Sequence, residues 1–62
     1  MATSSLAELD QRIAIVRDNI RQLTEQAAAV SGAEVESRIA DRIADQERLL
    51  AKLLKERESF RK

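Results

Sequence analysis

The sequence predicts an all-α fold, an antiparallel two-helix hairpin of the coiled-coil type, which we expect to dimerise into a four-helix bundle. Three observations predict it. The 62 residues include one Gly, no Pro and a single aromatic residue, a composition that favours helix over strand. Apolar residues recur at alternating steps of three and four in both halves of the chain, as in coiled coils. The two apolar stripes are out of phase, so one straight helix cannot carry both on the same side.

The first helix is expected at about 5–30, after a flexible N-terminus of residues 1–4. Ser5, followed by Glu8, has the spacing of a capping box, in which each side chain bonds to the other residue's backbone N–H. The apolar positions of this helix form an unbroken stripe over four heptads, made of Leu6, Leu9, Ile13, Val16, Ile20, Leu23, Ala27 and Val30. We call this stripe, with its counterpart in the second half, the seam.

The second half carries its seam in a shifted frame, made of Glu36, Ile39, Ile43, Gln46, Leu50, Leu53, Arg57 and Phe60. This frame lies two residues later than a continuation of the first, about 200° around a helix of 3.6 residues per turn. We therefore expect the chain to reverse at about 30–33 and a second helix at about 32–60, giving a single hairpin domain over 5–62.

A repeated segment supports these two helix starts. Residues 31–41, SGAEVESRIAD, match residues 5–15, SLAELDQRIAI, at six of eleven positions. By analogy with the first start, Ser31 and Glu34 predict a second capping box, and Val30 with Val35 predict a hydrophobic staple beside it. Gly32 supplies backbone freedom for the reversal.

The register follows from pairing the two seams, because facing residues of an antiparallel hairpin have numbers with a constant sum, here 66. The predicted layers are Leu6 with Phe60, Leu9 with Arg57, Ile13 with Leu53, Val16 with Leu50, Ile20 with Gln46, Leu23 with Ile43, Ala27 with Ile39, and Val30 with Glu36. This register brings Arg12 near Glu56 and Arg17 near Glu47. Gln46 is expected to fix register or oligomeric state, and Arg57 to lay its stem across Leu9 with its head in solvent.

Two flanks remain beside the seam. The Ala-rich flank, our candidate dimer or partner interface, consists of Ala7, Ala14, Thr24, Ala28, Ala40, Ala44, Ala51 and Leu54. Its small side chains would let two hairpins approach closely in a twofold bundle, although Ala also serves as a strong helix former on solvated faces. The polar flank carries Arg12, Asn19, Gln22, Gln26, Arg38, Arg42 and Asp45, with Val35, Ile15 and Leu49 among them. Ile15 and Leu49 form a second candidate contact site for a partner.

The residue inventory argues against an enzyme. There is no His, Cys or Tyr, so acid–base and nucleophilic chemistry would fall to other side chains. Ser5 and Ser31 are explained as caps. Asp41 and Asp45 stand one turn apart and could share a cation, but nearby Arg residues favour ordinary ion pairs. No phosphate-binding loop is present, and we expect no cofactor, no metal and no catalytic residue.

The same reasoning bounds partners and location. No apolar run is long enough to span a membrane and no export signal is recognisable, so we expect a cytoplasmic protein. A net charge of zero argues against nucleic acid. We expect a self-associating structural or adaptor module, or alternatively a small accessory subunit on a larger protein complex. In size and plan, and through no matched motif, the chain resembles the Rop type of dimeric RNA-binding hairpin; this resemblance implies an RNA-binding regulator as a further alternative.

Overall fold

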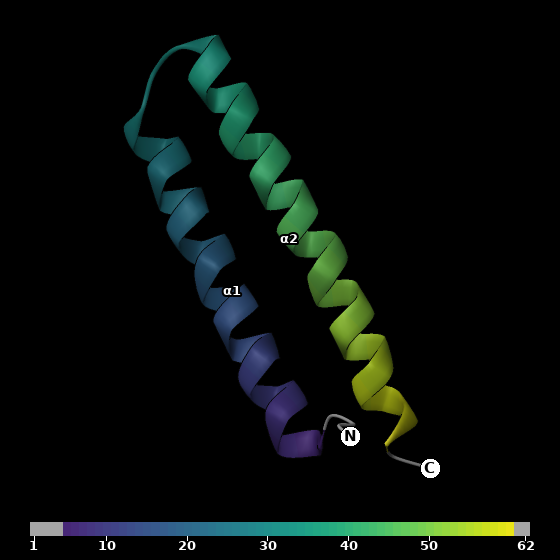
Figure 1. The fold of residues 1–62 in the computed structure, drawn as a ribbon. Coiled ribbons are helices and arrows are strands. Elements are labelled where there is room, and N and C mark those ends of the chain that lie inside the picture. Colours follow the sequence, from purple (N-terminus) through teal and green to yellow (C-terminus); the bar gives the residue numbers. More distant parts are fainter. Residues whose placement is uncertain (1–4, 61–62) are drawn as a thin grey trace.

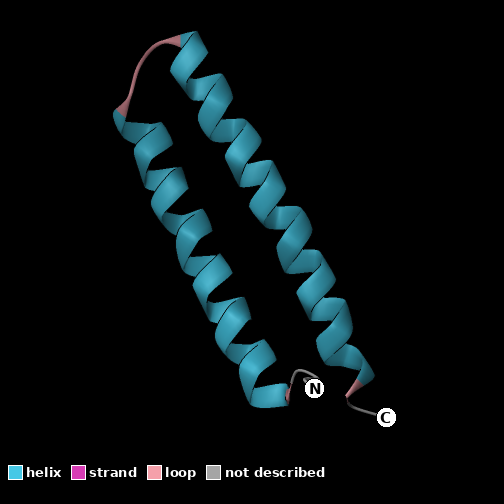
Figure 2. Cartoon of the chain, viewed as in Figure 1, coloured by secondary structure: helices cyan, strands magenta, loops and turns pink. Residues whose placement is uncertain are grey.

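The computed structural model describes residues 5–60. Helix α1 (Leu6–Ala29) and helix α2 (Ala33–Ser59) run antiparallel and pack against each other (Figure 1). A short link at residues 30–32 joins them, and no strand occurs in this part of the chain (Figure 2). The predicted all-α two-helix hairpin is therefore confirmed. The expected flexible segment 1–4 and the last two residues of the expected 5–62 domain lie outside the described residues.

The hairpin is a single layer of helices. It measures 45 × 20 × 14 Å, and its smallest dimension is close to the diameter of about 10–12 Å that one helix has with its side chains. Neither helix is covered on its outer side by another part of residues 5–60. The only apolar interior available within one chain is therefore the line along which α1 and α2 meet.

Helix α1 begins with the predicted capping box. The Glu8 backbone N donates to Ser5 Oγ at 3.1 Å, and the Ser5 backbone N donates to Glu8 Oε1 at 3.3 Å. Two backbone N–H groups that the first helical turn leaves without helical partners are thereby satisfied. The carboxylate of Glu8 also lies in the first turn, where negative charge interacts favourably with the helix dipole.

Helix α2 does not begin with a capping box, so the second half of that prediction is wrong. The N-cap is Gly32, with φ 126° and ψ 119°, and no side chain bonds to the helix start. Because Gly32 takes up the reversal with a positive φ that other residues rarely adopt, the helix starts one residue later than the Ser31 pattern implied. The predicted staple of Val30 and Val35 fails for the same reason, since those residues no longer flank the cap at the required spacing. Glu34 and Glu36 still place negative charge in the first turn.

The predicted seam is the core of the hairpin. Within residues 5–60, every buried or half-buried residue except Ala44 occupies a seam position. The buried side chains are Leu9, Ile13, Val16, Ile39 and Leu53, of which Leu9 is fully buried. The seam residues that remain exposed are at its ends, namely Leu6, Glu36 and Phe60. The out-of-phase stripes of the sequence therefore meet face to face, as the reversal of the chain requires.

Packing is tightest towards the open end, where α1 begins and α2 ends. Leu9, Ile13, Val16 and Leu53 form one buried cluster, against which Ile20 and Leu50 pack while partly buried. Towards the turn, the seam includes the small side chain of Ala27, and Ile39 is the one buried residue there among residues 5–60. Because a methyl group fills less space than the side chain of Leu or Ile, the turn half of the seam leaves room beside it.

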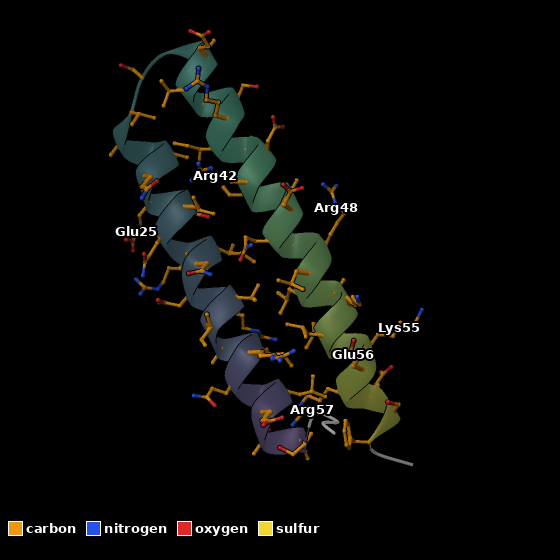
Figure 3. All side chains as sticks on the ribbon, viewed as in Figure 1. Glu25, Arg42, Arg48, Lys55, Glu56 and Arg57 are labelled. Carbon is orange, nitrogen blue, oxygen red and sulfur yellow. The ribbon has the colours of Figure 1, made fainter. Side chains whose placement is uncertain are left out.

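Two polar contacts cross between the helices and agree with the predicted register. Arg57 Nε donates to Asp10 Oδ1 at 2.5 Å, and Asn19 Nδ2 donates to Gln46 Oε1 at 3.3 Å. The residue numbers of these pairs sum to 67 and 65, on either side of the predicted 66. Figure 3 shows Arg57 between the two helices near the open end.

The two predicted ion pairs across the hairpin do not form. The ion pairs of residues 5–60 are Arg21 with Asp18 and Glu25, Arg48 with Asp45, and Arg57 with Asp10. Arg12, predicted beside Glu56, instead lines an apolar hollow with Ile15 and Leu49. Arg17 and Glu47 are both exposed, and long exposed side chains gain little by closing such a pair.

Candidate interaction surfaces

The Ala-rich flank is open to solvent along the whole hairpin. Seven of its eight predicted residues are exposed, and Ala44 is half-buried. Leu54 is the largest of them and is 38% exposed. The flank consists of Ala methyl groups, Thr24 and Leu54, and these side chains offer few groups that could bind a small molecule. Its small side chains instead suit close approach by another helix.

Three hollows lie along the polar flank, between the edges of α1 and α2. Each is lined by residues of that flank and of the adjoining seam, from Arg12 and Leu53 near the open end to Val30 and Val35 near the turn. All three are open to solvent, so they are stretches of a shallow groove.

The hollow nearest the open end joins the two exposed residues that we predicted as a second contact site. Ile15 from α1 is 54% exposed, Leu49 from α2 is 40% exposed, and both line this hollow together with Arg12. Its floor is formed by Val16 and Leu53 of the core. The structure thus brings Ile15 and Leu49 together across the groove.

The hollow next to the turn, which we call the turn groove, has a volume of about 400 Å³. It is lined by Gln26, Ala29, Val30, Val35, Arg38, Ile39 and Arg42. Apolar groups form most of its surface, and Val35 is 44% exposed. The groove lies beside Ile39, which the seam register pairs with the small side chain of Ala27.

Between these two hollows the groove is lined mostly by amides. Asn19, Gln22, Gln26 and Gln46 line it, with Arg42 and Asp45 at its edge. Gln22 Nε2 donates to Asp18 at 2.8 Å, and Asn19 donates to Gln46. Arg42 lines both this stretch and the turn groove, and Figure 3 labels it on the side of α2 that faces α1.

No protein-family model, no curated protein and no solved structure matches this chain. The candidate surfaces are therefore interpreted from their own residues alone.

Arg21 forms two ordinary surface ion pairs on α1, outside the groove. Arg21 donates to Asp18 at 2.6 Å and to Glu25 at 3.2 Å. The hydrogen bond to Asp18, followed by the charges of Asp18 and Glu25, raises the pKa of Arg21 above its ordinary value. Arg21 therefore stays charged at every physiological pH and is no proton donor. Glu25, Arg48 and Lys55 extend away from the neighbouring helix (Figure 3).

Residues 5–60 contain neither a cluster of metal ligands nor a membrane-spanning helix. No three His, Cys, Asp or Glu residues of 5–60 come together as a metal site would require; Asp45, half of the candidate Asp41 and Asp45 pair, is bonded to Arg48 instead. Neither α1 nor α2 has the length of apolar sequence that crossing a membrane demands.

Sequence reasoning missed the groove and both polar contacts between the helices. The contacts depend on side-chain directions that the seam positions do not specify, since Asp10 lies on the Ala-rich side and Asn19 on the polar side of α1. The groove had a signal in the sequence: Ala27 is the smallest seam residue of α1, and Gln22 and Gln26 stand one helical turn apart beside it.

Proposed function

We propose that this chain is a non-enzymatic hairpin that self-associates through its Ala-rich flank, as a homodimer, and acts as a structural or adaptor module in the cytoplasm. The dimer is a four-helix bundle in which each hairpin supplies one layer. Its interface is self-complementary, because a twofold axis brings the same flank of both chains together.

The small core of the hairpin carries this proposal. Residues 5–60 bury only five hydrophobic side chains, all of them along one line, and leave six large ones exposed: Leu6, Ile15, Val35, Leu49, Leu54 and Phe60. A lone core in a domain of this size rarely supplies more than roughly 3–5 kcal/mol. With no Cys in the sequence to form a disulfide, a second layer of helices is the remaining source of apolar burial.

The Ala-rich flank is the better of the two flanks for that second layer. Four-helix bundles pack their helices at close distance along nearly parallel axes, and a methyl group permits such an approach where a long polar side chain hinders it. The seam register brings Ala14 and Ala51 beside each other, and Ala44 follows two turns further along α2 on the same flank. The Ala-rich side also carries charges, among them Arg17 and Glu47. On the polar flank, however, the amides of Asn19, Gln22 and Gln26 would have to be desolvated in addition to its charges.

A pair of substitutions tests the flank. Ala14→Glu places a charge in the proposed interface, whereas Gln11→Glu adds the same charge on the exposed outer side of the same helix. We expect Ala14→Glu to weaken the dimer by at least about tenfold, since a buried unpaired charge is costly, and Gln11→Glu to leave it unchanged. Sedimentation velocity over a concentration series measures both. Equal association of the two variants would overturn the choice of flank.

A second candidate function rests on Ile15 and Leu49. These side chains line one hollow from opposite helices, and both are at least 40% exposed, which suits a small accessory subunit seated on a larger protein. Purification of the tagged chain from its native cells separates the two functions. A stoichiometric foreign partner that is lost with Ile15→Ser and kept with Ala14→Glu would favour the subunit.

A further inference from the structure

We propose that the turn groove binds an acidic peptide segment of another protein, one that carries a large apolar side chain beside its carboxylates. The groove lies on the polar flank, away from the interface of the proposed dimer. The inference therefore goes beyond self-association, and either can fail without the other. Each chain has one turn groove, so the proposed dimer would present two.

The apolar part of the site is a pocket for one side chain. Val30 from the link and Val35 and Ile39 from α2 converge there, with Ala29 at the end of α1. Val35 is 44% exposed although it is an aliphatic residue beside the core. Covering such a side chain contributes favourably to binding, because apolar surface is removed from water. An apolar residue of a partner would find this surface already formed.

Two guanidinium groups give the site its charge preference. Arg38 and Arg42 stand four residues apart on α2, which places them one turn apart on the same face, and both line the groove. Within residues 5–60 neither forms an ion pair. Like charges at this spacing repel each other, so an acidic occupant would relieve the repulsion as well as form charge-assisted hydrogen bonds.

Three carboxylates stand three or four residues from one of these arginines on α2, those of Glu34, Asp41 and Asp45. None of them forms an ion pair with Arg38 or Arg42. Asp45, the carboxylate that also lines the adjoining stretch, is bonded to Arg48. Facing the arginines from α1 are the uncharged amides of Gln22 and Gln26. The residues that line the turn groove therefore include two cations and no carboxylate, in contrast to the zero net charge of the chain.

The amides extend the site along the groove. Gln26 lines both the turn groove and the adjoining stretch, and Asn19, Gln22 and Gln46 continue the row. Side-chain amides both donate and accept hydrogen bonds, which matches the alternating donors and acceptors of a peptide backbone. An apolar pocket, two cations and a row of amides together favour a peptide over a simple anion or a lipid chain.

A selection from a phage-displayed library of random peptides tests the proposal on the whole chain. We expect the selected peptides to be enriched in Asp and Glu next to Leu, Ile or Phe. The double variant Arg38→Gln with Arg42→Gln should bind the best of them about tenfold more weakly, as expected for the loss of two partly exposed ion pairs. Val35→Ser should weaken binding as well, whereas raising the salt concentration should weaken the wild type more than the double variant.

The matched control is Lys52→Gln with Lys55→Gln, which removes the same charge from the same helix at positions that line none of the hollows. It should leave peptide affinity unchanged, and Gln is a good helix former in all four positions. Basic or uncharged selected peptides, the absence of any enriched peptide, or an equal loss of affinity in both double variants would overturn the proposal. The Ala14→Glu variant should still bind the selected peptides, whatever its oligomeric state. Such binding would show that peptide recognition does not depend on the proposed dimer.

Discussion

Arg57 reaches across the hairpin to Asp10, its Nε lying 2.5 Å from Asp10 Oδ1. Both side chains are well exposed, at 39% and 49%, so the ion pair itself should be worth no more than about 1 kcal/mol. Leu9, the residue that faces Arg57 in the seam register, is nonetheless only 1% exposed. We infer that the stem of Arg57 shields the end of the core while its head is held by Asp10.

This role predicts unequal effects on stability. Asp10→Asn removes the ion pair and should lower the free energy of unfolding by less than about 1 kcal/mol. Arg57→Ala should cost more, because it also uncovers Leu9, and Arg57→Met should recover the difference by restoring the stem. Urea denaturation of the three variants measures these costs. Equal costs for Asp10→Asn and Arg57→Ala would show that the stem contributes nothing.

The two helix starts give a second comparison. Ser5→Ala removes a capping box and should destabilise the protein by about 0.5–2 kcal/mol. Ser31→Ala should be close to neutral, since no side chain caps α2. Thermal unfolding followed by circular dichroism is sufficient to compare them. A similar loss in both variants would contradict the helix start at Gly32.

Gln46 gives a third prediction. Its amide accepts one long hydrogen bond, from Asn19, in an exposed setting, while its own position in the seam is half-buried. We expect Gln46→Leu to raise the stability by about 1 kcal/mol, because apolar burial outweighs so weak a bond, and to loosen the choice of oligomeric state. Asn19→Ala is the control that removes only the bond and should change little. A lower melting temperature for Gln46→Leu would mean that the contact with Asn19 matters more than its geometry indicates.

Arg17 and Glu47 give a fourth prediction, which concerns the proposed dimer interface. They flank the middle of the Ala-rich flank, both exposed, and form no ion pair within residues 5–60. In the proposed dimer these charges of the two chains cluster near the twofold axis. Arg17→Glu and Glu47→Arg should each weaken the homodimer, and an equimolar mixture of the two chains should form heterodimers.

Native mass spectrometry of the mixture detects those heterodimers. Arg42→Glu mixed with Asp41→Arg carries the same net charges away from the flank and should remain a statistical mixture. Preferential pairing in this control would attribute the effect to overall charge and would speak against the proposed interface.

The sequence predicted most of the fold because one pattern dominates it. The two seams, out of phase by two residues, require the reversal and set the register, and nearly all buried residues are where they predict. The prediction failed at Ser31, because the local resemblance to Ser5 carries no information about the backbone angle of Gly32. It failed also at Arg12 and Arg17, since exposed long side chains have many conformations of similar energy. The groove could not be predicted from residue spacing, because spacing does not tell how far apart the edges of the two helices lie beside Ala27.

Because a single hairpin layer is incomplete, we expect two chains to associate, and sedimentation equilibrium of the wild-type protein at low micromolar concentration is the direct test. We expect a mass twice that of the 7.0 kDa chain. The melting temperature should also rise with protein concentration, as mass action requires for a dimer that dissociates on unfolding. A well-folded species with the mass of a single chain, and a melting temperature independent of concentration, would contradict this expectation.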